Sequence, residues 1–89
     1  MKIILTVNGH DHEGIVAAVS SKLAEHHVNI LNISQTLMDG FFTMILHGSF
    51  DDSQQTIQEL QEAMKPVAQE QGLSIRIQSE AIFDAMHTL

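Results

Sequence analysis

The stretch VNILNISQTLMDGFFTMILHGSF, residues 28–50, decides the fold, because it predicts two strands joined by a tight turn. Asp39 and Gly40 form the turn, since an Asp-Gly pair between apolar runs is typical of a two-residue hairpin. In the second arm, buried and exposed positions alternate from Phe42 to Leu46 with the two-residue period of a strand. We therefore expect an antiparallel hairpin in the middle of the chain.

Upstream of the hairpin, the sequence predicts one strand and one helix. Residues 2–8 alternate between apolar and mixed positions, which is typical of a strand with one buried face. Residues 14–27 change to a helical period, in which Ile15, Val19 and Leu23 recur every four residues. The first half of the chain therefore has the order strand, helix, hairpin.

Downstream of the hairpin, residues 51–71 predict a second helix with an apolar face. Asp52 or Ser53 is expected to cap its start, because short oxygen-bearing side chains accept hydrogen bonds from the first free N–H groups. Pro66 lies inside the helical pattern and lacks a backbone N–H, so we expect a kink or a helix end nearby.

The chain ends with a strand over residues 73–78 and a tail over residues 79–89, for which we expect a short helix capped by Ser79. The order of elements is β-α-β-β-α-β plus a C-terminal helix, and right-handed crossovers then favour a ferredoxin-like sandwich. We predict the α+β class, with a four-stranded antiparallel sheet in the order 2-3-1-4 and two helices on one face. The length fits a single domain spanning residues 1–89.

The other face of this predicted sheet is not covered by the two helices. Ile4, Phe41 and Ile45 lie there, and apolar residues on an open face favour association with a partner. The strand over residues 28–38 is an edge strand with few charges, so it too can accept a neighbour. We expect a homodimer, formed most simply by two sheets joining edge to edge.

Composition excludes several classes of function. The formal net charge of −7 repels phosphate backbones, so nucleic acid is not an expected partner. The absence of cysteine excludes disulfides and thiolate zinc sites. No apolar run approaches the roughly 20 residues of a membrane span, and the N-terminus lacks the pattern of a signal peptide. We expect a cytoplasmic protein that contacts no membrane.

The sequence shows none of the residue patterns that are typical of catalysis. No serine has the context of a nucleophile elbow, and no two carboxylates are placed for acid–base chemistry. Asp51 and Asp52 are better explained by helix capping. We therefore expect neither enzyme activity nor a cofactor.

The loop over residues 9–13 is the strongest candidate for a binding site. The N–H groups at a helix start have no partner within the helix, and together with the helix dipole they favour a carboxylate or phosphate. Asp11 would then hold the ammonium group of an amino acid, and Gly14 would let the ligand approach. The alternative is structural: Gly9 relieves a turn, Asp11 or His12 caps the helix, and Gly14 permits close packing.

The same loop contains two histidines that are separated by one residue. His10 and His12, with Asp11 or Glu13, offer donors for a transition metal. The alternative is that both rings are solvated, because a structural zinc site needs four ligands at definable spacing.

A second group of polar residues lies in the next strand: Asn29, Asn32, Ser34 and Gln35. Asparagine is disfavoured in strands, so Asn29 and Asn32 need an explanation. Either the strand is an edge where water satisfies their amides, or the two side chains meet a ligand at a dimer interface.

Short motifs in this order resemble the ACT domain over almost the full chain. They are Asp11-x-x-Gly14-Ile15-Val16, Leu23-Ala24-Glu25 and Val28-Asn29-Ile30. The segments NISQT, FFTM and IQSEAIFDAMHTL resemble the stand-alone bacterial family with a single ACT domain, whose role is not characterised. The first half is also similar to the ACT repeats of the glycine-cleavage repressor.

This resemblance implies a ferredoxin-like module that binds small molecules, often amino acids, between two subunits. Asp11 in the first loop of one subunit and Asn29 in the second strand of the other would hold the amino and carboxylate groups. The residues that we accordingly assign to ligand binding are Asn8, Gly9, His10, Asp11, His12, Gly14, Ile15, Asn29, Ile30, Leu31 and Asn32.

Three functional hypotheses follow from the sequence. The first is a non-enzymatic regulatory module that senses an amino acid or similar metabolite at a homodimer interface and signals to a partner protein. The second is a ligand-free module for protein–protein interaction or dimerisation. The third is a metal-responsive module that uses the loop histidines.

Overall fold

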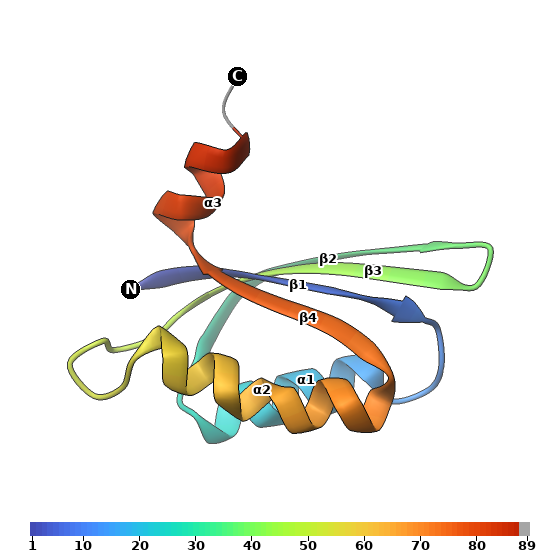
Figure 1. Cartoon of the computed structure of the whole chain (residues 1–89), viewed down its shortest axis with the longest axis horizontal. Coiled ribbons are helices and arrows are strands. Elements are labelled where there is room, and N and C mark those ends of the chain that lie inside the picture. Colours follow the sequence, from blue (N-terminus) through green and yellow to red (C-terminus); the bar gives the residue numbers. More distant parts are fainter. Residues whose placement is uncertain (88–89) are drawn as a thin grey trace.

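The computed structural model describes residues 1–87 and contains one sheet and three helices (Figure 1). The elements are, in chain order, β1 (Lys2–His10), α1 (Ile15–Glu25), β2 (Asn29–Met38), β3 (Phe41–Ser49), α2 (Ile57–Gln71), β4 (Leu73–Ser79) and α3 (Glu80–His87). The predicted order β-α-β-β-α-β plus a C-terminal helix is confirmed.

The sheet has four antiparallel strands in the order β2-β3-β1-β4, as predicted. Helices α1 and α2 lie on one side of it, whereas α3 rises from the other side (Figure 1). The hairpin between β2 and β3 turns through Asp39 and Gly40, whose φ angles of 51° and 78° are those that a tight hairpin turn requires. The face opposite α1 and α2 is called the open face below.

The core lies between the sheet and the two helices. Alternate residues of β1 and β3 point into it, and the exposed fractions of Leu5, Met44 and Leu46 are 0%. Helix α1 contributes Val19 and Leu23, which are also fully buried. No polar or charged residue in the described part of the chain is buried, so the core is held by apolar packing.

Helix α2 begins later than the sequence predicted. Its first residue is Ile57, and its cap is Thr56 rather than Asp52 or Ser53. The residues before it form a separate turn, in which the Asp51 carboxylate accepts hydrogen bonds from the Ser53 hydroxyl at 2.6 Å and the Ser53 N–H at 3.0 Å. Both bonds lower the pKa of the Asp51 carboxyl, and the bond from the Ser53 hydroxyl has the larger effect. Asp51 and Asp52 therefore cap no helix.

Pro66 lies inside α2. Helix α2 continues past Pro66 to Gln71, so the helix end expected near this proline is wrong. The predicted tail helix is confirmed as α3, and its cap is Ser79, whose hydroxyl accepts a hydrogen bond from the Ile82 N–H at 3.2 Å. Residues 88 and 89 of the predicted tail lie outside the described residues.

Membrane-spanning helices are not found among residues 1–87, because no helix there combines the necessary length and apolar character.

Candidate ligand site

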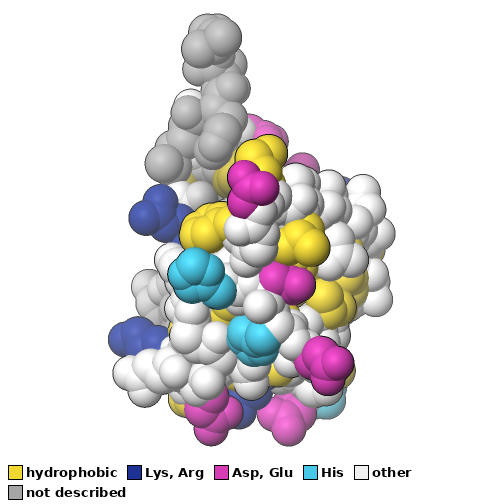
Figure 2. Space-filling view, turned by 90° about the vertical axis from the view of Figure 1, so that its right-hand side faces the viewer, with side chains coloured by type: hydrophobic (Ala, Val, Ile, Leu, Met, Phe, Trp, Pro, Cys, Tyr) yellow, Lys and Arg dark blue, Asp and Glu magenta, His cyan; other side chains and the backbone are white. Residues whose placement is uncertain are grey.

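The loop between β1 and α1 is attached to the hairpin turn. The Asp11 N–H donates a hydrogen bond to the Gly40 carbonyl oxygen at 2.8 Å. One residue earlier, the ring of His10 meets the ring of Phe41 edge-on, with centroids 6.0 Å apart. The end of β1, the loop and the hairpin turn therefore form one connected surface, which Figure 2 shows with histidine, acidic and apolar side chains side by side.

The start of α1 differs from the prediction that Asp11 or His12 caps it. Gly14 is the residue that precedes the helix, with a φ of 88°, and no side chain donates or accepts a hydrogen bond as a cap. Its carbonyl oxygen accepts the first helical bond, from the Ala18 N–H at 2.9 Å. The left-handed conformation of Gly14 sets the direction of the chain where a capping side chain would otherwise stand.

The first amides of α1 are therefore without a protein partner within the helix. The N–H groups of Ile15, Val16 and Ala17 precede the first residue that donates to a helical carbonyl. The first turn also contains no acidic residue that would offset the positive end of the helix dipole. This arrangement can accept a carboxylate or phosphate oxygen. Ile15 itself is 2% exposed and packs into the core.

His12 connects the loop to the far end of α2. Its Nε2 atom lies 2.9 Å from the Gln71 carbonyl oxygen, and its Nδ1 atom lies 3.0 Å from the Glu13 carbonyl oxygen. A neutral imidazole can donate from only one nitrogen, whereas the protonated ring donates from both. The carbonyls of Gln71 and Glu13 therefore raise the pKa of His12, and the nearby Asp11 adds to this effect. A protonated His12 would add positive charge beside the start of α1.

A pocket of about 200 Å³ adjoins the loop. It is lined by Asp11, Gln35, Thr36, Leu37 and Phe42. Sequence analysis assigned none of the last four to the site. The signal was available in the predicted strand order, because the residues that precede the Asp-Gly turn must lie near the end of β1 once β1 and β3 are paired.

The two groups of predicted site residues lie at opposite ends of the sheet within one chain. His10 pairs with Phe41 at one end of β3, whereas Asn29 pairs with Ser49 at the other. The strand rise places these ends about 26 Å apart. Asn29 and Asn32 are exposed on the edge strand, Ile30 is half-buried, and Leu31 lies at an irregularity of the pairing with an exposed fraction of 47%. One chain does not bring Asp11 and Asn29 together.

Comparison with known proteins now decides the family. A model of the ACT domain matches residues 2–78. The chain belongs to the ACT domain family. A UPF0237 protein of Corynebacterium glutamicum is 61% identical over 89 residues and is covered completely, as is this chain. An ACT domain protein from Streptococcus pneumoniae is 46% identical, with a TM-score of 0.83 over 98% of each chain.

A structure assigned to a glycine cleavage system transcriptional repressor is also similar. Its identity is 19%, its TM-score is 0.76, and the match covers 86% of this chain and 44% of that chain, so it supports the fold alone. The resemblance that the short motifs predicted is confirmed. The chain is an ACT domain module related to regulatory domains that bind ligands.

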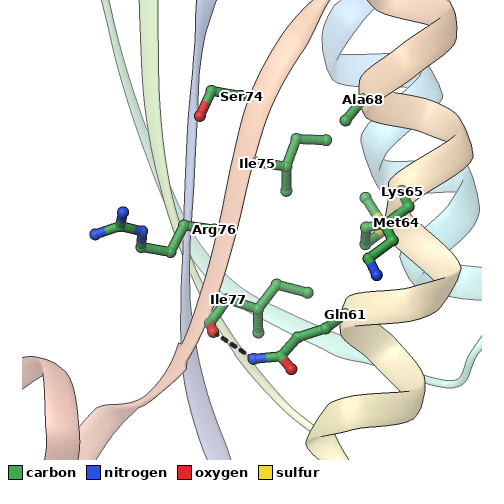
Figure 3. Close-up of a pocket in the computed structure, with 8 residues that line it drawn as sticks. All are labelled: Gln61, Met64, Lys65, Ala68, Ser74, Ile75, Arg76 and Ile77. Atoms are coloured by element: carbon green, nitrogen blue, oxygen red, sulfur yellow. Dashed lines mark hydrogen bonds between the residues drawn. The ribbon is translucent and has the colours of Figure 1, made fainter.

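The second edge strand of the sheet is β4, and it is less open to an added strand than β2 is. A groove of about 400 Å³ runs between β4 and α2 (Figure 3). Gln61 of α2 donates a hydrogen bond from Nε2 to the Ile77 carbonyl oxygen at 3.0 Å, so a side chain occupies an acceptor that an added strand would need. Arg76 points away from α2 in this view. The edge at β4 is therefore partly closed, whereas β2 is exposed along most of its length.

The described residues show no group of three or more His, Cys, Asp and Glu side chains that could hold a metal ion. The two nitrogens of His12 face carbonyl oxygens, and the His10 ring packs on Phe41. The loop histidines thus have other contacts in this ACT domain.

Proposed function

We propose that this ACT domain is a cytoplasmic, non-enzymatic regulatory module that binds an amino acid or similar metabolite at a homodimer interface. The single observation that carries the proposal is the start of α1, whose first amides have no capping side chain and which follows a loop whose Asp11 lines a pocket. A molecule with a carboxylate and an ammonium group matches these two features. The bound state would be read by a partner protein.

The dimer that fits this site joins the β2 strands of two copies in antiparallel fashion. A two-fold axis near the middle of β2 sets the first residue of one strand beside the last residue of the other. Asn29 of one copy would then approach Met38 of the second copy, next to the second copy's loop. The length of β2 and its exposed residues support this edge over β4.

The ligand would lie with its carboxylate at the free amides that open α1, where a protonated His12 adds favourable charge. Its ammonium group would meet the carboxylate of Asp11. Asn29 from a second copy, or Gln35 from the same chain, would supply the remaining polar contact. Ligand binding would join the two copies more firmly, because each ligand contacts both.

The alternative function is a ligand-free interaction module. It is favoured by the apolar residues around the hairpin turn, since Leu37, Met38 and Phe41 have exposed fractions of 58%, 68% and 49%. In this alternative the loop only supports the turn, and the protein partner binds whether or not a metabolite is present.

Isothermal calorimetry with the common amino acids, preceded by a thermal-shift screen, tests the proposal. We expect one amino acid to bind and Asp11→Ala and Asn29→Ala each to weaken it at least tenfold, which is about 1.4 kcal/mol. Gln58→Ala is the matched control, because Gln58 is exposed on α2 far along the chain from the loop. Absence of binding by every amino acid, or unchanged affinity in both site variants, contradicts the proposal.

A further inference from the structure

The loop that precedes α1 is attached on two sides to parts of the chain that are remote in sequence. On one side, the Asp11 N–H donates to the Gly40 carbonyl oxygen of the hairpin turn at 2.8 Å. On the other side, His12 Nε2 lies 2.9 Å from the Gln71 carbonyl oxygen, which is 59 residues away. The loop and the turn from α2 into β4 lie at the same end of the molecule (Figure 1). His12 therefore joins the loop to the end of α2.

The end of α2 has no cation of its own. The last carbonyl oxygens of a helix lack partners within the helix, and the negative end of the helix dipole favours a positive charge there. The last turn of α2, which the structure describes in full, contains no basic side chain. Its C-terminal cap is Gly72, whose N–H bonds to the Ala68 carbonyl oxygen. The Gln71 carbonyl meets a donor from outside the helix, and a protonated His12 supplies both the N–H and the charge.

The Gln71 carbonyl belongs to a closely packed part of the fold. Gly9, near the end of β1, pairs with Leu73 in the β1–β4 ladder. A Cβ atom placed on Gly9 would lie 2.7 Å from Leu73 Cδ2 and 3.2 Å from the Gly72 carbonyl oxygen, which is closer than a side chain normally approaches. The end of β1 and the turn from α2 into β4 are thus in direct contact. They offer the His12 ring an acceptor whose place does not depend on the ring itself.

The protonation state of His12 decides how many of its two contacts are hydrogen bonds. Nε2 faces the Gln71 carbonyl oxygen, and Nδ1 faces the Glu13 carbonyl oxygen at 3.0 Å. Each contact needs an N–H group on the ring. A neutral imidazole has one such group and an imidazolium has two, so deprotonation removes one bond of the pair together with the positive charge.

The surroundings of the ring favour its protonated form. The side chains of the loop, the hairpin turn and the last turn of α2 that are charged at neutral pH are all acidic: Asp11, Glu13, Asp39 and Glu70. The other titratable group beside the loop is His10, whose ring packs against an aromatic ring of β3. The Gln71 carbonyl, followed by the Glu13 carbonyl, raises the pKa of His12 above its ordinary value of about 6.5. The charge of Asp11 raises it further.

We propose that an amino acid bound at the start of α1 causes His12 to take up a proton from solvent, so that binding depends on pH. This inference rests on the proposed function, which puts the carboxylate of the bound molecule beside that ring. A protonated ring attracts the carboxylate and holds the loop to α2 with both bonds. Linkage is reciprocal, so a molecule that binds the charged form more tightly also raises the proton affinity of the ring. The affinity therefore falls as pH rises.

Calorimetry at pH 6 and pH 8, with each of the common L-amino acids as the probe, measures the linkage. For an amino acid that binds, we expect the wild-type affinity to be about threefold higher at pH 6. His12→Lys keeps a positive charge at both pH values, so it should bind with an affinity that changes little between them. His12→Gln carries no charge and should bind weakly at both. His26→Gln removes a ring at the other end of α1 and should keep the wild-type ratio.

Proton uptake is measured by repeating the titrations at pH 7 in two buffers with different heats of ionisation. The wild type and His26→Gln should take up protons on binding, whereas His12→Lys and His12→Gln should take up fewer. A ring with a merely structural role would not change this count. If an amino acid binds, and the wild type matches His12→Gln in pH ratio and proton uptake, the linkage is overturned and the proposed function stands. If no amino acid binds at either pH, both are overturned.

Discussion

The two helices that cover the sheet begin in opposite ways. At the start of α2, the Thr56 hydroxyl accepts a hydrogen bond from the Glu59 N–H at 3.2 Å, and the Glu59 carboxylate accepts one from the Thr56 N–H at 3.3 Å. This reciprocal pair is a capping box. At the start of α1, Gly14 offers no side chain, and the first turn contains no acidic residue.

The capping box indicates that the start of α2 serves stability alone, whereas the start of α1 has no such cap. A capping side chain stabilises a helix by about 1 kcal/mol, and α2 has this stabilisation. Helix α1 lacks it, although its first residue, Ile15, is buried and fixes the helix in place through packing. The uncapped amides at the start of α1 are then available to a ligand, which would supply the missing cap.

The largest expected effect comes from placing a carboxylate at the open start. Gly14→Asp would occupy the amides of α1 and repel an anionic ligand, so the affinity for the amino acid found by calorimetry should fall at least tenfold. Gly14→Asn is the matched control, because asparagine has the same shape, carries no charge and tolerates the left-handed φ of 88°. Affinities equal to that of the wild type for both Gly14→Asp and Gly14→Asn would show that the amides of α1 hold no carboxylate.

Removal of the cap of α2 should affect stability and leave binding unchanged. Thr56→Ala loses the hydroxyl that accepts the Glu59 N–H, and we expect a loss of about 1 kcal/mol in the free energy of unfolding, measured with urea. Glu59→Gln keeps the capping pattern and should change stability by less than about 0.5 kcal/mol. A change in ligand affinity for Thr56→Ala would contradict the division of roles between the two helix starts.

Sequence reasoning predicted the strands and their order better than it predicted these helix starts. The hairpin was predictable because the Asp-Gly turn has no competing interpretation between two apolar arms. The start of α2 was not, because Asp52, Ser53 and Thr56 are all suitable caps. The chain resolves the competition by folding residues 51–55 into a turn of their own, in which Gln54 and Gln55 donate to the Asp51 carbonyl oxygen.

The candidate site was predictable in part for a similar reason. The loop over residues 9–13 was recognisable as a strand-to-helix connection with glycines. In the structure β1 extends to His10, so the connection is shorter than predicted, and its Asp11 lines a pocket. Gln35 was not assigned to this site, because its place beside Asp11 follows from the pairing of β2, β3 and β1 and not from a local pattern. The role of Asn29 stays a prediction, since it depends on a second copy of the chain.

The smallest expected effect concerns pH and the exposed pair of hydrogen bonds, called the His12 clip below, by which the His12 ring joins the Glu13 carbonyl of the loop to the Gln71 carbonyl of α2. The carbonyl oxygens of Gln71 and Glu13 raise the pKa of His12 in the folded chain above its ordinary value. A raised pKa in the folded state means that the clip contributes fully below the unfolded value of about 6.5 and is lost as pH rises through the higher folded value. The stability difference between wild type and His12→Gln, measured with urea, should therefore shrink from pH 5 to pH 9.

Proton NMR titration of the His12 ring measures the same linkage directly. The midpoint should lie above that of the same ring in an unfolded peptide of residues 8–16, because the peptide lacks the Gln71 carbonyl on α2. A midpoint at or below the peptide value, or a stability difference that does not depend on pH, would show that the ring does not donate from both nitrogens. Helix α1 would then begin without the additional positive charge, and its open amides alone would have to hold an anionic ligand.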